Sequence, residues 1–103
     1  MDWFRVTCDE EEVRADVAPP GGVAWSRAIR WGSVERVCFE AGGLWESDTW
    51  YLFERGEPHS LMIPSGAPGT GELLDALMAR GLFPAELAIR AATGEGLTCW
   101  PTE

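Results

Sequence analysis

Residues 48–64 read DTWYLFERGEPHSLMIP, and this stretch decides the fold. Two apolar runs, at 50–53 and 61–63, flank the turn-forming residues 54–58. A strand with one face in water alternates apolar and polar residues, whereas a strand that is apolar at every position is covered on both faces. The stretch therefore predicts a hairpin at the centre of a sheet, with other parts of the protein against each face.

The segment 34–41 joins this hairpin to its N-terminal side. Val37, Phe39 and Ala41 fall on one face of an alternating strand, and short connections link the segment to the hairpin. Residues 34–64 therefore predict a three-stranded antiparallel meander. Residues 23–31 fit either a helix or a strand, and we favour a loop that enters a short strand near Ala28.

Two more half-buried strands are predicted at 4–8 and 13–17, joined by the consecutive acids at 9–12. Downstream, Thr70 can cap a helix that Gly81 ends in a left-handed conformation. A second short helix is predicted at 84–92 and a final strand at 97–100.

Strands that run together and helices that run together are typical of an α+β protein with an antiparallel sheet. We expect a single domain over 1–103, with about five to six strands, flat or curled, and two C-terminal helices on one face. The other face still carries apolar side chains. A closed barrel, a second copy or a partner must then cover it.

Composition places the chain among folded proteins, because 46% of its 103 residues are hydrophobic and six are tryptophan. No apolar run has the length of a membrane span, and the first residues have no apolar signal segment. A cytoplasmic location is the resulting expectation. For Cys8, Cys38 and Cys99, an odd number spaced far apart, we expect free buried thiols.

The net charge of −9 argues against nucleic acid and anionic membranes as partners and would favour a basic protein. All eight basic residues are arginine. The lack of lysine excludes a phosphate-loop lysine, a Schiff base and a lysine general base.

No residue pattern predicts a reaction or a cofactor. The glycine-rich loop 66–72 precedes a helix but lacks the Gly-Lys-Ser/Thr ending of a phosphate loop. His59 is the one histidine, and with the cysteines it lacks the paired spacing of structural zinc ligands. Asp48, just before the apolar run, is the acid to examine first. We therefore predict no catalytic residues, no metal and no cofactor.

The tryptophans are the unusual feature, because tryptophan is enriched where proteins bind one another. Most of them stand in apolar runs and suit the core, whereas Trp25 and Trp45 stand in loop-like surroundings. The predicted partner-binding residues are Trp25, Trp45, Trp50 and Tyr51.

The overall pattern resembles small bacterial domains with no assigned function. The resemblance covers residues 28–100 and rests on the following positions: Ile29-x-Trp31, Val34-x-x-Val37, Asp48-x-Trp50, Ile63-Pro64 and Cys99-Trp100. The pattern is also somewhat similar to bacterial pleckstrin-homology-like sheets, from which the second helix and final strand depart. Neither resemblance supplies a catalytic residue.

Three functional hypotheses follow. The first is a non-catalytic domain that binds protein or itself as a homodimer, through the sheet face away from the helices. The second is an acidic inhibitor or immunity-type partner of a basic protein, motivated by the net charge. The third is a small-ligand binder or enzyme that uses Asp48 or His59.

Overall fold

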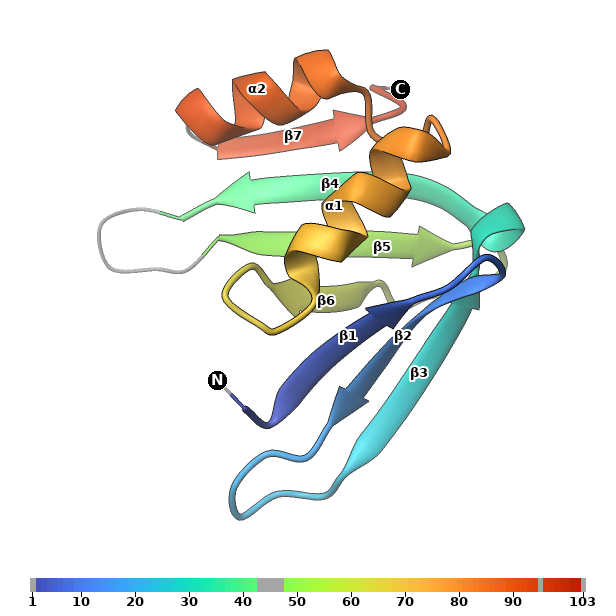
Figure 1. The fold of residues 1–103 in the computed structure, drawn as a ribbon, viewed down its shortest axis with the longest axis vertical. Coiled ribbons are helices and arrows are strands. Elements are labelled where there is room, and N and C mark those ends of the chain that lie inside the picture. The colour runs from blue at the N-terminus through green and yellow to red at the C-terminus, as the bar shows by residue number, and fades with distance from the viewer. Residues whose placement is uncertain (1, 43–47, 95, 103) are drawn as a thin grey trace.

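The structure is a computed structural model that describes residues 2–42, 48–94 and 96–102 (Figure 1). Within these residues the chain forms strands, two α-helices and one short 3-10 helix. In chain order these are β1 (Phe4–Cys8), β2 (Glu12–Val17), β3 (Trp25–Arg30), η1 (Trp31–Ser33), β4 (Val34–Ala41), β5 (Thr49–Glu54), β6 (Leu61–Pro64), α1 (Thr70–Ala79), α2 (Ala85–Thr93) and β7 (Gly96–Trp100). The predicted α+β class is confirmed.

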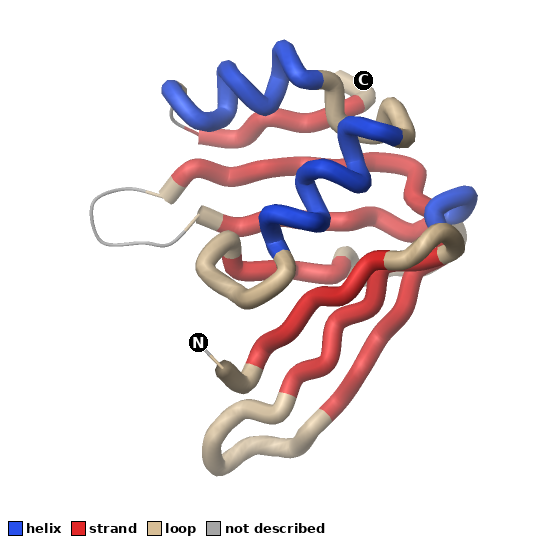
Figure 2. Tube along the Cα trace, viewed as in Figure 1, coloured by secondary structure: helices blue, strands red, loops and turns tan. Residues whose placement is uncertain are grey.

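The strands form two antiparallel sheets instead of the single sheet of five to six strands that the sequence predicts (Figure 2). One sheet has the order β1-β2-β3, and the other has the order β6-β5-β4-β7, which contains the predicted meander. The sheets separate because η1 turns the chain between β3 and β4, and these two strands do not pair. An ion pair between Arg27 and Glu54, at 3.2 Å, joins the two sheets.

The ambiguous segment 23–31 is a strand for most of its length. β3 begins at Trp25, three residues before the predicted start, and pairs with β2 along six positions. Tertiary pairing decides here, because the β2 edge supplies hydrogen-bond partners that the local sequence cannot reveal.

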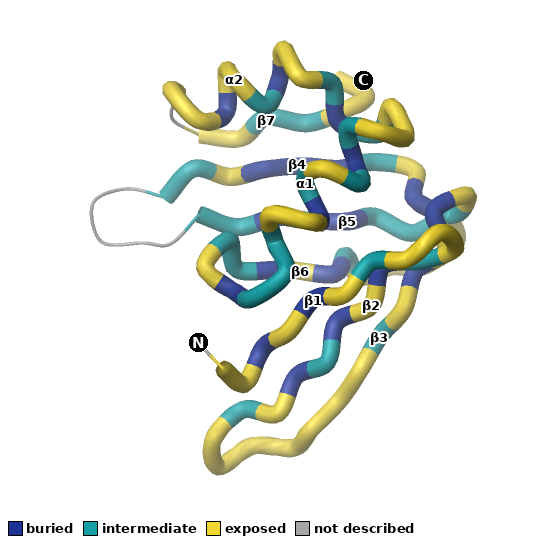
Figure 3. The backbone as a smooth tube through the Cα atoms, in the orientation of Figure 1, coloured by how far each residue is buried: buried dark blue, intermediate teal, exposed yellow. Residues whose placement is uncertain are grey.

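Both helices lie on one side of the four-stranded sheet (Figure 1). Their buried side chains, Leu73 and Leu77 of α1 and Leu87 and Ala91 of α2, are one helical turn apart and form the stripe that packs inward. The core also takes the inward side chains of both sheets, so a single apolar cluster holds the molecule together (Figure 3).

The start of α1 differs from the prediction. Gly69 occupies the N-cap position with φ of +97°, and the Thr70 hydroxyl donates to the Ser65 and Ala67 carbonyls instead of capping the helix. The amide of Val6 donates to the Pro68 carbonyl at 2.9 Å, which fastens β1 to this loop. The close approach leaves no room for a side chain at Gly69.

Gly69→Ala is expected to lower the free energy of unfolding by about 3 kcal/mol. A Cβ at this position would overlap the Val6 carbonyl oxygen, and the positive φ disfavours any other residue. Gly66→Ala is the matched control, because its Cβ would stand in open space and its φ is not positive. Urea unfolding of both variants measures the difference, and equal midpoints would contradict the close packing of β1 on this loop.

The end of α1 follows the prediction. Gly81 has φ of +69°, its amide donates to the Met78 carbonyl, and the Leu82 amide donates to the Leu77 carbonyl. This pair of bonds is the Schellman motif, which turns the chain back over the last helical turn. Phe83 is thereby inserted into the core.

The acidic link 9–12 is a structural turn. The amides of Glu12 and Glu11 donate to the Asp9 carboxylate and hold its pKa below its usual range. The Trp31 indole donates to the Asp9 carbonyl at 2.9 Å, and the Arg80 guanidinium lies 4.5 Å from the Trp31 ring centroid. The turn therefore joins the three-stranded sheet to the end of α1.

Two of the three cysteines form a disulfide, so the prediction of free thiols is wrong for Cys38 and Cys99. β4 and β7 pair antiparallel with these residues directly opposite each other, although 61 positions separate them in sequence. Cys8 is free and half-buried, and burial raises the pKa of its thiol. The disulfide removes the free-thiol argument for a reducing compartment, and cytoplasmic location stays a prediction.

In the described part of the chain, neither helix has the length and apolar character that crossing a bilayer requires.

Candidate functional site

The four-stranded sheet has one face that neither helix of the described residues covers, which we call the outer face. Register places its side chains in three rows: Phe53 and Arg36 in the first, Met62, Tyr51, Cys38 and Cys99 in the second, and Pro64, Thr49, Glu40 and Leu97 in the third. The side chains between these positions point the other way, toward the helices. The hairpin therefore has apolar residues on both faces, as its sequence predicts.

Two large apolar side chains of the outer face are exposed. Met62 on β6 is 55% exposed and Leu97 on β7 is 61% exposed, so they stand at opposite edges of the face. Tyr51 and Phe53 lie between them and are half-buried. Exposed apolar side chains at both edges, with half-buried aromatic side chains between them, make this face a candidate binding surface.

A hollow of about 620 Å³ lies beside Leu97 on the same face. Its walls include Arg36, Phe53 and the Cys38–Cys99 disulfide. The outer face thus has a projection at its β6 edge, the Met62 side chain, and a depression at its β7 edge. A surface with one projecting side chain and one hollow suits a partner of complementary shape.

Charge is sparse among the side chains of these rows. Glu40 accepts a hydrogen bond from the Tyr51 hydroxyl at 2.7 Å, and Arg36 stands in the first row. One acid and one base balance each other, although the whole chain carries −9. These rows are therefore mostly apolar and close to neutral, and Glu35, which lines the hollow beside Leu97, adds one acid at the border of the face.

The four predicted binding residues do not form one surface in the structure. Tyr51 lies on the outer face, whereas Trp50 points to the helix side, is 5% exposed and packs against Phe83 with ring centroids 5.1 Å apart. The assignment of Trp50 to the outer face is therefore wrong, because adjacent residues of a strand face opposite ways. Trp25 is exposed on β3 of the other sheet, against Phe4, and Trp45 lies outside the described residues.

Asp48 and His59 do not form a catalytic pair. The Asp48 carboxylate accepts the Gly42 amide at 2.8 Å before β5, and His59 is exposed after β5. The six residues of β5 lie between them, and a strand of that length spans about 20 Å. Among the described residues, no group of three or more potential ligands could hold a metal ion.

The residues of the outer face that sequence reasoning missed are Phe53, Met62 and Leu97. A signal for Met62 was present, because a strand with Leu61 and Ile63 pointing inward must point Met62 outward. Leu97 gave no comparable signal, since its face depends on pairing between β7 and β4.

Comparisons of the chain with protein-family models, with curated proteins and with solved structures gave no match.

Proposed function

We propose that this protein is a non-catalytic, self-associating domain whose outer face binds the outer face of a second copy. The observation that carries the proposal is the exposure of Met62 and Leu97 on a sheet face that no helix covers. Burying such side chains stabilises an association by about 25 cal/mol per Å² of apolar surface.

A second copy fits because the outer face is complementary to itself. A twofold axis parallel to the strands, passing between β5 and β4, sets β6 of one copy over β7 of the other. Met62 of each copy then meets the hollow beside the disulfide of the second copy. The two sheets pack face to face with their strands roughly aligned, as in β-sandwiches.

The charges of the outer face permit this arrangement. Under the same axis, Arg36 lies over Phe53 and Glu40 lies over Thr49 of the second copy. No like charges oppose each other, and a guanidinium over an aromatic ring is attractive. Most of the net charge of −9 is carried by side chains outside the three rows.

Met62→Asp and Leu97→Asp are each expected to weaken the dimer about 100-fold or more, because each leaves two unpaired carboxylates in an apolar interface. Ile89→Asp on α2 is the matched control, since Ile89 is 68% exposed but lies on a helix. Sedimentation velocity at equal concentrations measures the dimer fraction of each variant.

The expected result is dimer for Ile89→Asp and monomer for the two outer-face variants. If all three variants sediment like the unmodified protein, the outer face is not the interface. Retained far-ultraviolet circular dichroism separates loss of the dimer from loss of the fold.

A further inference from the structure

We infer that the pocket between the two helices and the four-stranded sheet binds a small, neutral, apolar molecule that carries one hydrogen-bond acceptor. This pocket lies on the opposite side of the sheet from the outer face, so the inference goes beyond self-association. Its volume is about 260 Å³.

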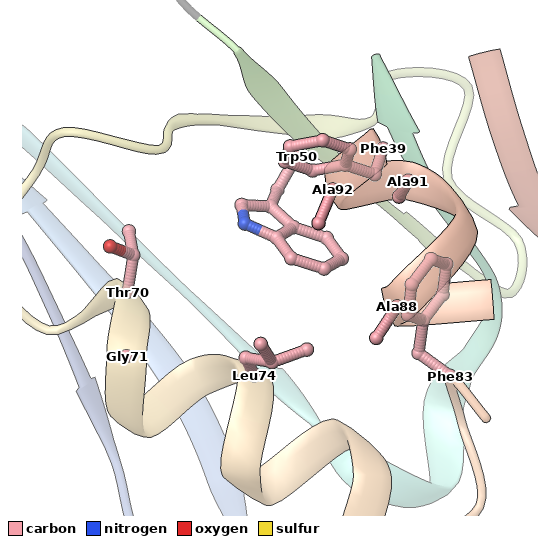
Figure 4. A pocket seen from close by; sticks show the side chains of 9 residues that line it. All are labelled: Phe39, Trp50, Thr70, Gly71, Leu74, Phe83, Ala88, Ala91 and Ala92. Carbon is pink, nitrogen blue, oxygen red and sulfur yellow. The ribbon is translucent and has the colours of Figure 1, made fainter. Parts of the chain in front are cut away.

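The pocket walls come from every layer of that side of the molecule (Figure 4). They comprise Phe39 and Trp50 from the sheet, Thr70, Gly71 and Leu74 from α1, Phe83 from the connection, and Ala88, Ala91 and Ala92 from α2. The small side chains on α2 leave the space that larger residues would fill. A cavity with aromatic and aliphatic walls favours an apolar ligand.

Two polar groups break this apolar lining: the Thr70 hydroxyl, which already donates to backbone carbonyls, and the Trp50 indole N–H. Trp50 is 5% exposed overall and no described residue accepts a hydrogen bond from its indole N–H, but the nitrogen itself remains open to water in the pocket. Figure 4 shows the indole nitrogen on the edge of the ring that faces Thr70 and Gly71 across the pocket. A ligand that fills the pocket displaces water from this N–H, so a ligand with an acceptor atom at that point keeps a hydrogen bond that a purely apolar ligand would lose.

The start of α1 adds to this preference. Gly71 has no side chain, so the backbone of the first helical turn borders the pocket on the side that the indole nitrogen faces. The amides of that turn lack intrahelical partners and carry a partial positive charge. Both features favour an electron-rich oxygen, such as a carbonyl or an ether.

An anionic ligand fits poorly. Glu72 stands in the first turn of α1, and the chain carries −9 overall. No basic side chain is among the residues that line the pocket. A carboxylate or phosphate would lose its hydration without a cation to replace it, so the acceptor belongs to a neutral molecule.

The volume of the pocket limits the size of the ligand. Dry cavities of about 150 Å³ hold benzene, so 260 Å³ admits a bicyclic aromatic or a chain of comparable bulk. The aromatic rings of Trp50 and Phe83 add edge-to-face contacts for such a ring. A naphthyl ketone therefore represents the class.

The test compares 2-acetylnaphthalene with 2-ethylnaphthalene, which has nearly the same shape but no acceptor. Titration calorimetry on the unmodified protein should show the ketone binding about fivefold more tightly. In ¹H–¹⁵N spectra the ketone alone should move the Trp50 indole resonance downfield. Trp50→Phe identifies that resonance and should give the two probes equal affinity.

Ala88→Phe should weaken both probes at least tenfold by filling the space between the helices. Ala85→Phe, an exposed position on the same helix outside the pocket walls, should leave both affinities unchanged. The inference is overturned if neither probe binds the unmodified protein. It is also overturned if the ketone shows no advantage, or if it binds without moving the Trp50 resonance.

Discussion

Reduction of the Cys38–Cys99 disulfide is expected to lower the free energy of unfolding by about 4 kcal/mol. The bond spans 61 positions, so it removes many conformations from the unfolded chain. It also fixes β7 to β4 at the second pair of their five-pair register. The loss is comparable to the whole stability margin of a small domain.

The measurement is urea unfolding with and without reductant, in a Cys8→Ser background so that the remaining free thiol cannot exchange. A thiol count on the urea-unfolded protein gives the oxidation state directly. We expect none before reduction and two after it, with a lower midpoint in the reduced sample. Two thiols before reduction, or an unchanged midpoint, would contradict the cross-strand bond.

Phe83→Ala is expected to cost about 4 kcal/mol of unfolding free energy. Phe83 is fully buried, and its ring meets the Trp50 ring edge to face at 5.1 Å. Removing it takes away the apolar contact between the helix connection and the sheet and leaves a cavity that the fixed backbone cannot close.

Leu82→Ala is the control, because Leu82 precedes Phe83 but is only half-buried, and about 1 kcal/mol is expected for it. Urea unfolding at one fixed protein concentration compares the two, since the proposed dimerisation would make the midpoint concentration-dependent. Similar losses for both variants would show that Phe83 is not the residue that holds the helices on the sheet.

Local patterns predicted the elements that depend on local interactions. Alternation at Val37 and Phe39 gave the correct inward face of β4, and Gly81 adopts the left-handed conformation expected of it. The hairpin forms the predicted β5–β6 pair, but its position at the centre of a sheet is only half right, because β6 is an edge strand. In each case the residues that determine the geometry are neighbours in sequence.

The features that the sequence did not predict depend on contacts between residues far apart in the chain. The division into two sheets follows from the turn at η1, which carries no glycine-proline signal beyond Gly32. The disulfide follows from pairing of β7 with β4 across 61 positions. The pocket needs α1, α2 and β5 to converge, which no single stretch encodes.

The predicted partner-binding residues were only partly predictable from local sequence. The sequence predicted correctly that the hairpin has two apolar faces, but the choice of both Trp50 and Tyr51 for one face conflicts with the alternation of strand side chains. Applying that alternation selects Tyr51, Phe53 and Met62 together. The sequence thus indicated a hairpin with two apolar faces, and strand geometry identified the members of the proposed binding face.

Sedimentation equilibrium of the unmodified protein between 1 and 100 µM, as an order-of-magnitude range for a standard interface, is the most direct test of outer-face pairing. The proposal predicts a mass that rises with concentration toward twice the 11.3 kDa of one chain. A mass that stays at 11.3 kDa at every concentration would contradict it.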